Sequence, residues 1–143
     1  MRSMSTPLLL TLLLVLSGCA ASLANPDTDA RAKLLRPTEG KSLIYVFRNQ
    51  PSSAPWLIGM SLDGQDMGST AANTYFRWSV EPGQHILISH SENAAPLVLV
   101  TEPGKIYYVW QDVTVGFFRP HTDLREVDHT TAEVALRTCY LRS

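Results

Sequence analysis

Four histidines are the side chains of this chain best suited to bind a metal ion. A transition-metal site needs two or three ligands that converge on one point. His85 and His90 are five residues apart, so on a regular strand they point to opposite faces. His121 and His129 could instead converge through a loop, with Asp123 as a third ligand. Two alternatives stay open: a small metal- or ligand-binding, enzyme-like site in that loop, or solvated loop residues with no metal.

Hydrolytic chemistry would need a nucleophile beside a base that a third group orients. Ser89 precedes His90, but adjacent residues of a strand face apart. Ser91 and Glu92 come next and form no recognisable nucleophile elbow. The sequence contains neither G-x-S-x-G nor a phosphate-binding glycine loop. We therefore predict no catalytic residue and a protein that is not an enzyme.

Aromatic side chains are concentrated in one short stretch, which ends at Phe117 and Phe118. In a strand over residues 106–111, Tyr108 and Trp110 would share one face and Tyr107 would lie on the other. Exposed rings suit contacts with proteins or glycans. The candidate binding residues are therefore Tyr107, Trp110, Phe117 and Phe118, with Tyr75 nearby. The alternative is that both faces of this strand are covered by the core.

The elements that must position these side chains are short strands. Between residues 41 and 118, runs rich in β-branched and aromatic residues alternate with turn signals. The runs are residues 43–48, 56–62, 65–70, 74–80, 85–90, 97–100, 106–111 and 113–118, of which 97–100 is expected to be wholly buried. Asp63-Gly64 predicts a tight hairpin, and Pro82-Gly83 and Pro103-Gly104 predict type II turns.

The strand over residues 74–80 has the clearest half-buried alternation. The pattern predicts Phe76, Trp78 and Val80 on the core side. The intervening side chains are expected to face solvent: Tyr75, Arg77 and Ser79.

Seven or eight strands at regular spacing, with no helical pattern between them, predict a mainly β fold. The expected architecture is an antiparallel β-sandwich, immunoglobulin-like or transthyretin-like. Near the C-terminus the period changes, and Thr130 and Glu133 fit a helix capping box. A short C-terminal helix would place on one face Ala132, Leu136, Cys139 and Tyr140. The alternative for this segment is a further strand.

The N-terminus has the layout of a secretory leader. Arg2 precedes an apolar run over residues 8–16, too short to span a bilayer, and small residues follow it. The box Leu16-Ser17-Gly18-Cys19 resembles the lipobox of bacterial lipoproteins. That resemblance implies cleavage before Cys19 and a diacylglycerol on its thiol, the only cofactor-like group expected. An ordinary signal peptide with an incidental cysteine is the alternative.

This leader sets the expected organisation and location. Residues 1–18 would be the signal peptide, 19–40 the lipidated N-terminus with a flexible tether, and 41–143 the β-sandwich domain. A lipid-anchored chain has the membrane as a partner. Ala20, in place of an aspartate after the cysteine, favours the outer membrane, with the domain facing the periplasm. The expected location is therefore the cell envelope.

Charge and cysteine content exclude two further classes of protein. The formal net charge of −1 lacks the cationic excess of a nucleic-acid-binding protein. With Cys19 occupied by lipid, Cys139 has no partner within the chain, which excludes a disulfide framework. A lone thiol of this kind is typically a small buried hydrophobe.

The order of these motifs is similar to that of an uncharacterised bacterial lipoprotein family, domain of unknown function 2846. The shared features are the lipobox, the strand over 43–48 and the turn motifs Leu62-Asp63-Gly64, Val80-Glu81-Pro82-Gly83 and Pro103-Gly104-Lys105. The resemblance implies a small β-rich domain facing the periplasm and no established activity. We expect a non-catalytic binding or envelope-assembly module with a protein or glycan partner.

Overall fold

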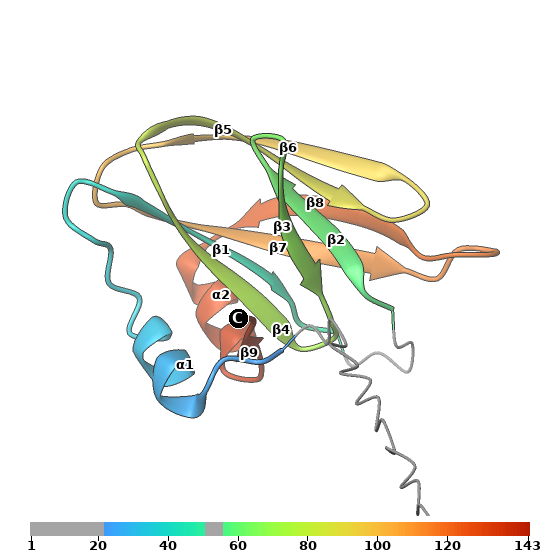
Figure 1. Cartoon of the computed structure of the whole chain (residues 1–143), viewed down its shortest axis with the longest axis horizontal. Helices are drawn as coiled ribbons and strands as arrows, with labels where there is room; N and C mark the ends of the chain where they lie inside the picture. Colours follow the sequence, from blue (N-terminus) through green and yellow to red (C-terminus); the bar gives the residue numbers. More distant parts are fainter. Residues whose placement is uncertain (1–21, 51–55) are drawn as a thin grey trace, which may run out of the picture.

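The computed structural model describes residues 22–50 and 56–143, and within these ranges it contains nine strands and two helices (Figure 1). The helices are α1 (Pro26–Ala32) and α2 (His129–Leu136). The strands are β1 (Ser42–Arg48), β2 (Ile58–Leu62), β3 (Gln65–Thr70), β4 (Thr74–Val80), β5 (Gly83–His90), β6 (Ala94–Thr101), β7 (Ile106–Thr114), β8 (His121–Val127) and β9 (Tyr140–Leu141). In this part of the chain no helix is both long and apolar enough to cross a bilayer.

The strands form two sheets, which confirms the predicted mainly β sandwich with a short C-terminal helix. One sheet has five strands in the order β8-β7-β1-β4-β9, and the other has four in the order β3-β2-β5-β6. Most strand pairs are antiparallel, as predicted, but two are parallel, β1 with β7 and β4 with β9. Turn motifs in a sequence indicate only which consecutive strands pair, so the sequence contains no local motif that indicates these long-range pairings.

Two of the three predicted turns are present. The predicted type II turn at Pro82-Gly83 is not, because Gly83 has φ 145°, far from the φ of about 80° in such a turn, and already belongs to β5. Asp63 and Gly64 both have positive φ, 51° and 81°, and connect β2 to β3 as a tight hairpin. Gly104 has φ 73° in the turn where Lys105 N–H donates to the Glu102 carbonyl (3.3 Å). These turns start the strands at the expected residues.

The main core lies between the two sheets. Phe76 and Trp78 from β4 are buried there with ring centroids 5.4 Å apart, and Val80 is buried beside them, as the alternation predicted. The strand over residues 97–100, expected to be wholly buried, is instead part of β6, at the edge of the four-stranded sheet. Only Leu99 of this run is buried, because alternate side chains of the strand face the outer side of this sheet, where Val98 and Val100 are exposed.

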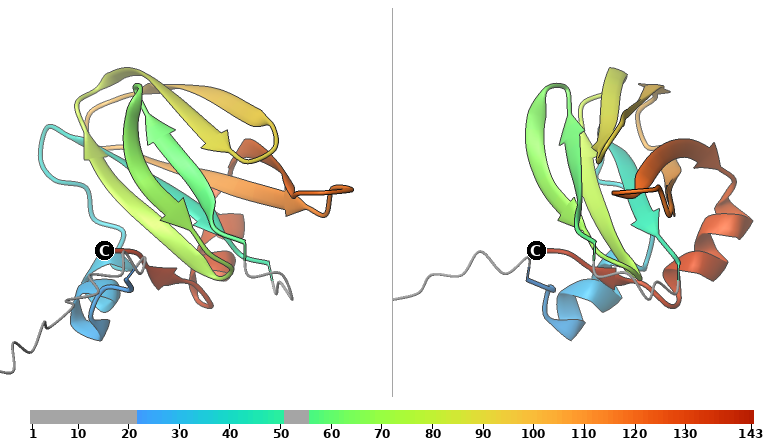
Figure 2. Two further views of the ribbon diagram at one scale, coloured as in Figure 1. Left: turned by 45° about the vertical axis from the view of Figure 1, so that its right-hand side comes forward. Right: turned by 90° about the vertical axis from the view of Figure 1, so that its right-hand side faces the viewer.

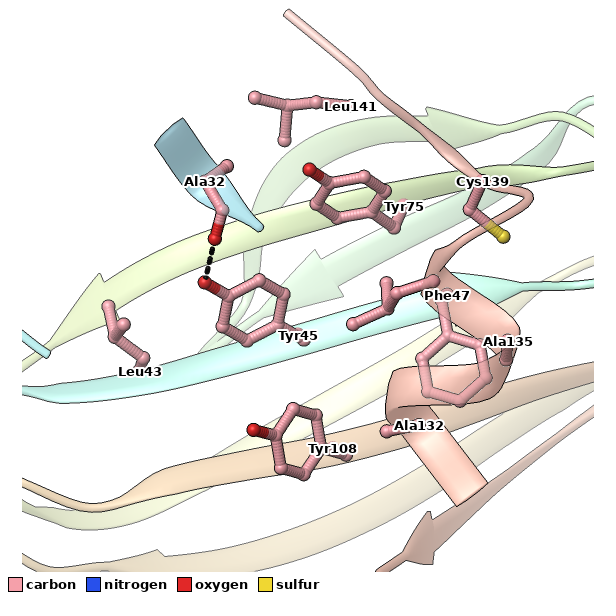
Figure 3. Close-up of a cluster of buried hydrophobic side chains, with 11 residues drawn as sticks. Ala32, Leu43, Tyr45, Phe47, Tyr75, Tyr108, Ala132, Ala135, Cys139 and Leu141 are labelled. Carbon is pink, nitrogen blue, oxygen red and sulfur yellow. Dashed lines mark hydrogen bonds between the residues drawn. The ribbon is translucent and has the colours of Figure 1, made fainter. Parts of the chain in front are cut away.

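A second core covers the outer face of the five-stranded sheet, where α1 and α2 pack on it (Figures 2 and 3). Tyr45 and Phe47 project from β1 into this core, and the Tyr45 hydroxyl donates to the Ala32 carbonyl (2.6 Å). Tyr75 is fully buried here, so its predicted solvent exposure is wrong. Both faces of β4 are covered, because helices from the two ends of the chain meet on this sheet.

Residues 22–40 differ from the expected flexible tether, because they pack on the domain. Asn25 caps α1 by accepting from Thr28 N–H (2.9 Å), and Pro26 occupies the first turn, where a missing N–H costs nothing. Leu23 forms a β-bridge with Arg142, and Ala32 is buried. The folded body therefore begins well before Lys41.

The C-terminal third differs from the prediction in one strand and in the cap of its helix. The expected strand over residues 113–118 does not exist: β7 ends at Thr114, a loop follows, and β8 starts at His121. The C-terminal helix is confirmed as α2, but its N-cap is Asp128, whose carboxylate accepts from Thr131 N–H (2.8 Å), and not Thr130. Cys139 is a free, fully buried thiol, as predicted.

Candidate functional site: an aromatic loop tip

The loop between β7 and β8 presents three apolar side chains to solvent, and we call them the aromatic tip: Val115, Phe117 and Phe118. Their exposed fractions are 92%, 92% and 79%. The two phenylalanine rings meet edge to face, with centroids 4.7 Å apart and planes at 80°. The loop projects beyond the body of the sandwich (Figures 1 and 2). Large apolar side chains exposed together in this way mark interaction surfaces in soluble domains.

The base of this loop is held by the β5–β6 turn. The Asn93 side chain donates to the Thr122 carbonyl (2.7 Å) and accepts from the Thr122 N–H (2.9 Å). Ser91 donates its hydroxyl to the Pro120 carbonyl. At Gly116 the chain passes so close to itself that an added Cβ would lie 2.1 Å from the Arg119 carbonyl oxygen. The loop therefore has a defined base and a shape that requires glycine.

A buried polar network supports the same end of the sandwich. The Gln111 amide donates to the Ser89 hydroxyl (2.6 Å), which in turn bonds the Thr122 hydroxyl (2.6 Å). Thr70 donates to the Gln111 amide oxygen. All four side chains are buried, and they come from both sheets. Satisfied buried networks of this kind fix the relative position of the elements they join.

Further apolar surface adjoins the loop. Trp56 and Leu57 are exposed, at 44% and 56%, on the approach to β2. They line an open depression of about 360 Å³ together with Arg119 and Pro120 of the loop. The depression therefore adjoins Arg119 and Pro120, the two residues that follow the aromatic tip along the loop.

Two of the predicted binding residues, Tyr107 and Trp110, are partly buried and less available to a partner than expected. Tyr107 packs against the main core, and its hydroxyl accepts from Glu102 N–H (3.0 Å). Trp110 packs on Phe47, with centroids 5.2 Å apart, and the Arg125 guanidinium covers its ring at 4.7 Å. Of the sequence-predicted aromatic set, the structure leaves Phe117 and Phe118 free to contact a partner.

The three candidate metal ligands do not converge. Residues 121–127 form strand β8 where a loop was expected, and at about 3.3 Å per residue this strand holds its two ends, His121 and Val127, about 20 Å apart. His129 follows in α2, beyond the far end of the strand from His121. His121 lies near the Glu92 carboxylate (3.5 Å), and His129 bonds the Tyr108 hydroxyl (2.9 Å). Across residues 22–50 and 56–143 no three His, Cys, Asp or Glu side chains are grouped closely enough to hold a metal.

The structure reveals one serine–histidine pair that sequence reasoning missed. Ser61 Oγ lies 2.8 Å from His90 Nε2 across the β2–β5 pair. Ser89 is buried and His90 is exposed, so these adjacent residues face apart, as predicted. The pair depends on the β2–β5 register, which places Gly59 opposite His90 and so brings Ser61 within reach of the imidazole. The spacing of the two residues in the sequence gives no signal for it. No carboxylate within the described ranges is hydrogen-bonded to His90 Nδ1. The pair therefore lacks the orienting acid of a catalytic triad.

Together these features define a two-layer β domain with helices on one outer face and an exposed aromatic loop. The chain belongs to the family described as "Protein of unknown function (DUF2846)", whose model matches residues 38–123 and so includes the aromatic tip. It is also similar to an "Uncharacterized protein" of Haemophilus influenzae, with 27% identity over 126 residues. That similarity covers 86% of this chain and 75% of the relative.

Proposed function

We propose that this protein is a lipid-anchored, non-catalytic module of the bacterial cell envelope that docks a protein partner through the aromatic tip. The observation on which the proposal rests is the pair Phe117 and Phe118, almost fully exposed on a loop whose base is fixed. Burying an aromatic ring at an interface removes roughly 150–250 Å² from water. Anchoring at a membrane concentrates the module near its partners, so a modest affinity suffices.

A protein pocket fits this tip better than a glycan does. Phenylalanine offers no hydrogen-bonding group, and planes at 80° do not form one flat platform on which a sugar ring could stack. Aromatic anchors that enter an apolar pocket are typical of the energetic centre of protein interfaces. The neighbouring Trp56 and Leu57 would extend the contact.

The anchor in this proposal is the lipidated thiol of Cys19, in the outer membrane and facing the periplasm. Support for it comes from the Leu16-Ser17-Gly18-Cys19 box and from Ala20, all outside the described residues. Two or three acyl chains would make attachment effectively permanent.

The test is recovery of partners from detergent-solubilised envelopes by the anchored full-length chain. A Phe117→Ser/Phe118→Ser variant should lose the discrete proteins that the wild type retains. The matched control is Val98→Ser/Val100→Ser on edge strand β6, since these side chains are also exposed, at 55% and 67%. Equal recovery by all three proteins, or loss with the control alone, would overturn the proposal.

A further inference from the structure

Three arginines line one cavity where the two ends of the described chain meet. Arg31 comes from α1, Arg77 from β4, and Arg142 follows β9. The cavity has a volume of about 410 Å³, and Thr28 and Ala24 complete part of its wall. Figures 1 and 2 show the C-terminus beside α1, which is how residues far apart in sequence come to share this site.

These guanidinium groups have no carboxylate partner. Within residues 22–50 and 56–143 none of the three forms an ion pair, and segments 1–21 and 51–55 contain no Asp or Glu. Arg77 donates to the Tyr45 hydroxyl (3.1 Å) and the Arg36 carbonyl (3.2 Å), and Arg31 donates to the Asp27 carbonyl (3.2 Å). All of these acceptors are neutral, so none of these hydrogen bonds compensates the positive charge of the side chain that donates it.

Arg142 is the most unusual of the three. Its Nη2 atom is buried and has no hydrogen-bond partner in the described part of the chain, and burial lowers the pKa of its guanidinium. A buried, unpaired donor on a charged group is costly unless something accepts its hydrogen bond.

The Asp29 carboxylate of α1 does not neutralise the cavity, because its hydrogen bonds go elsewhere. Asp29 accepts from Lys33 (2.7 Å), from the Tyr75 hydroxyl (2.9 Å) and from the Leu141 N–H (2.8 Å). Asp29 is also absent from the cavity wall.

We propose that this cavity binds a phosphate group through Arg31, Arg77 and Arg142, with the Thr28 hydroxyl as an additional donor. Guanidinium forks match the geometry of phosphate oxygens, and charge-assisted bonds of this kind are about twice as strong as neutral ones. A phosphate would supply a charged acceptor, which none of the three guanidinium groups has within the described residues.

The position of the cavity indicates a phospholipid headgroup as one source of that phosphate. Residues 22–24 run beside 141–143: Ala24 N–H donates to the Leu141 carbonyl (2.9 Å), and Ser143 N–H donates to the Ser22 carbonyl (3.1 Å). Ser22 is three residues beyond Cys19, a span of at most about 11 Å. This step rests on the proposed lipid anchor, whereas binding of free phosphate does not.

The experiment follows the arginine side-chain Nε–Hε NMR signals of the full-length chain in non-ionic detergent during titration with inorganic phosphate. Saturable shifts of the cavity arginines are expected, with affinity reduced at least tenfold in Arg142→Gln and in Arg31→Gln. Arg31→Gln is included because Arg31 is exposed, so this variant should fold even if Arg142→Gln does not. Arg137→Gln on α2, where Arg137 pairs with Glu133 (3.2 Å), should bind as the wild type does.

A second arm compares nanodiscs of phosphatidylcholine alone with nanodiscs that contain phosphatidylglycerol. Shifts in the second and not the first support an anionic headgroup, and shifts with inorganic phosphate alone support a soluble phosphate ligand. No saturable shift with either probe, or equal weakening by Arg137→Gln, would overturn the proposal. The phosphate arm needs neither the lipid anchor nor the aromatic tip, so its failure is distinguishable from failure of the docking function.

Discussion

The side chain of Asn93 pairs with the backbone of Thr122 as a neighbouring strand would, donating to its carbonyl (2.7 Å) and accepting from its N–H (2.9 Å). This contact joins the β5–β6 turn of one sheet to the first residues of β8 in the other. Thr122 stands at the start of β8, at the base of the loop that carries the aromatic tip. The pose of the tip therefore depends on a contact between the two sheets and not on the loop alone.

Replacing Asn93 with Ala should loosen the loop. Both backbone groups of Thr122 lose their partner, and an unsatisfied buried group costs about 1–3 kcal/mol. We expect a lower free energy of unfolding and faster amide hydrogen exchange over residues 115–122. Gln84→Ala, at an exposed position of β5, is the control and should leave both quantities unchanged. Unchanged exchange in Asn93→Ala would show that the pair does not hold the loop.

Asp29 should make stability depend on acid. Burial alone would raise the pKa of its carboxyl, but hydrogen bonds from Lys33, Leu141 N–H and Tyr75 together hold the pKa below its ordinary value. A lowered pKa in the folded state contributes stability above the unfolded value near 4, and that contribution is lost as pH falls toward the folded value.

Asp29→Asn should accordingly have a lower free energy of unfolding than the wild type at pH 7, measured by urea titration. The expected loss is about 1.5–3 kcal/mol, the value typical of hydrogen bonds to a charged group. The difference should shrink as the pH is lowered below 4. Equal stability at pH 7, or a difference that grows in acid, would contradict the role assigned to this carboxylate in holding α1 on the sheet.

Cys139 should be chemically inert in the folded protein. Burial raises the pKa of its thiol to about 12, so the reactive thiolate is scarce at neutral pH. We expect no modification by iodoacetamide under native conditions and complete modification in 6 M guanidinium chloride. Rapid native labelling would mean that the second core opens easily.

Cys19→Ser should abolish lipoprotein-type processing and release from the leader, because the oxygen nucleophile does not replace the thiol as lipid acceptor. Metabolic labelling with a palmitate analogue, followed by intact mass, measures this. A wild-type chain that carries no acyl mass would contradict the anchor.

The part of the fold set by local pattern could be predicted from sequence. Phe76, Trp78 and Val80 alternate within one strand, and Asp63-Gly64 makes a hairpin by its own backbone preference. The burial of Tyr75 could not be predicted from sequence, because α1 and α2 come from opposite ends of the chain to cover it. The prediction of a strand over 113–118 was wrong because the loop folds back so that Gly116 lies against the Arg119 carbonyl. The β propensity of the residues contains no information on such a contact.

The candidate site was predictable to the same extent. Phe117 and Phe118 stood out as part of an aromatic cluster, but their exposure depends on where β7 ends. The Ser61–His90 pair required the β2–β5 register. The arginine cavity joins residues 31, 77 and 142, and no spacing rule brings these together.

Site-specific photo-crosslinking tests the docking claim most directly. A benzophenone amino acid is placed at Phe118 of the membrane-anchored chain in living cells, and the same probe is placed at Val100 as the exposed control. We predict a discrete, protease-sensitive adduct with a protein from position 118 and none from position 100. No adduct at 118, the same adduct at both positions, or an adduct that is a glycan would contradict the claim that the aromatic tip docks a protein partner.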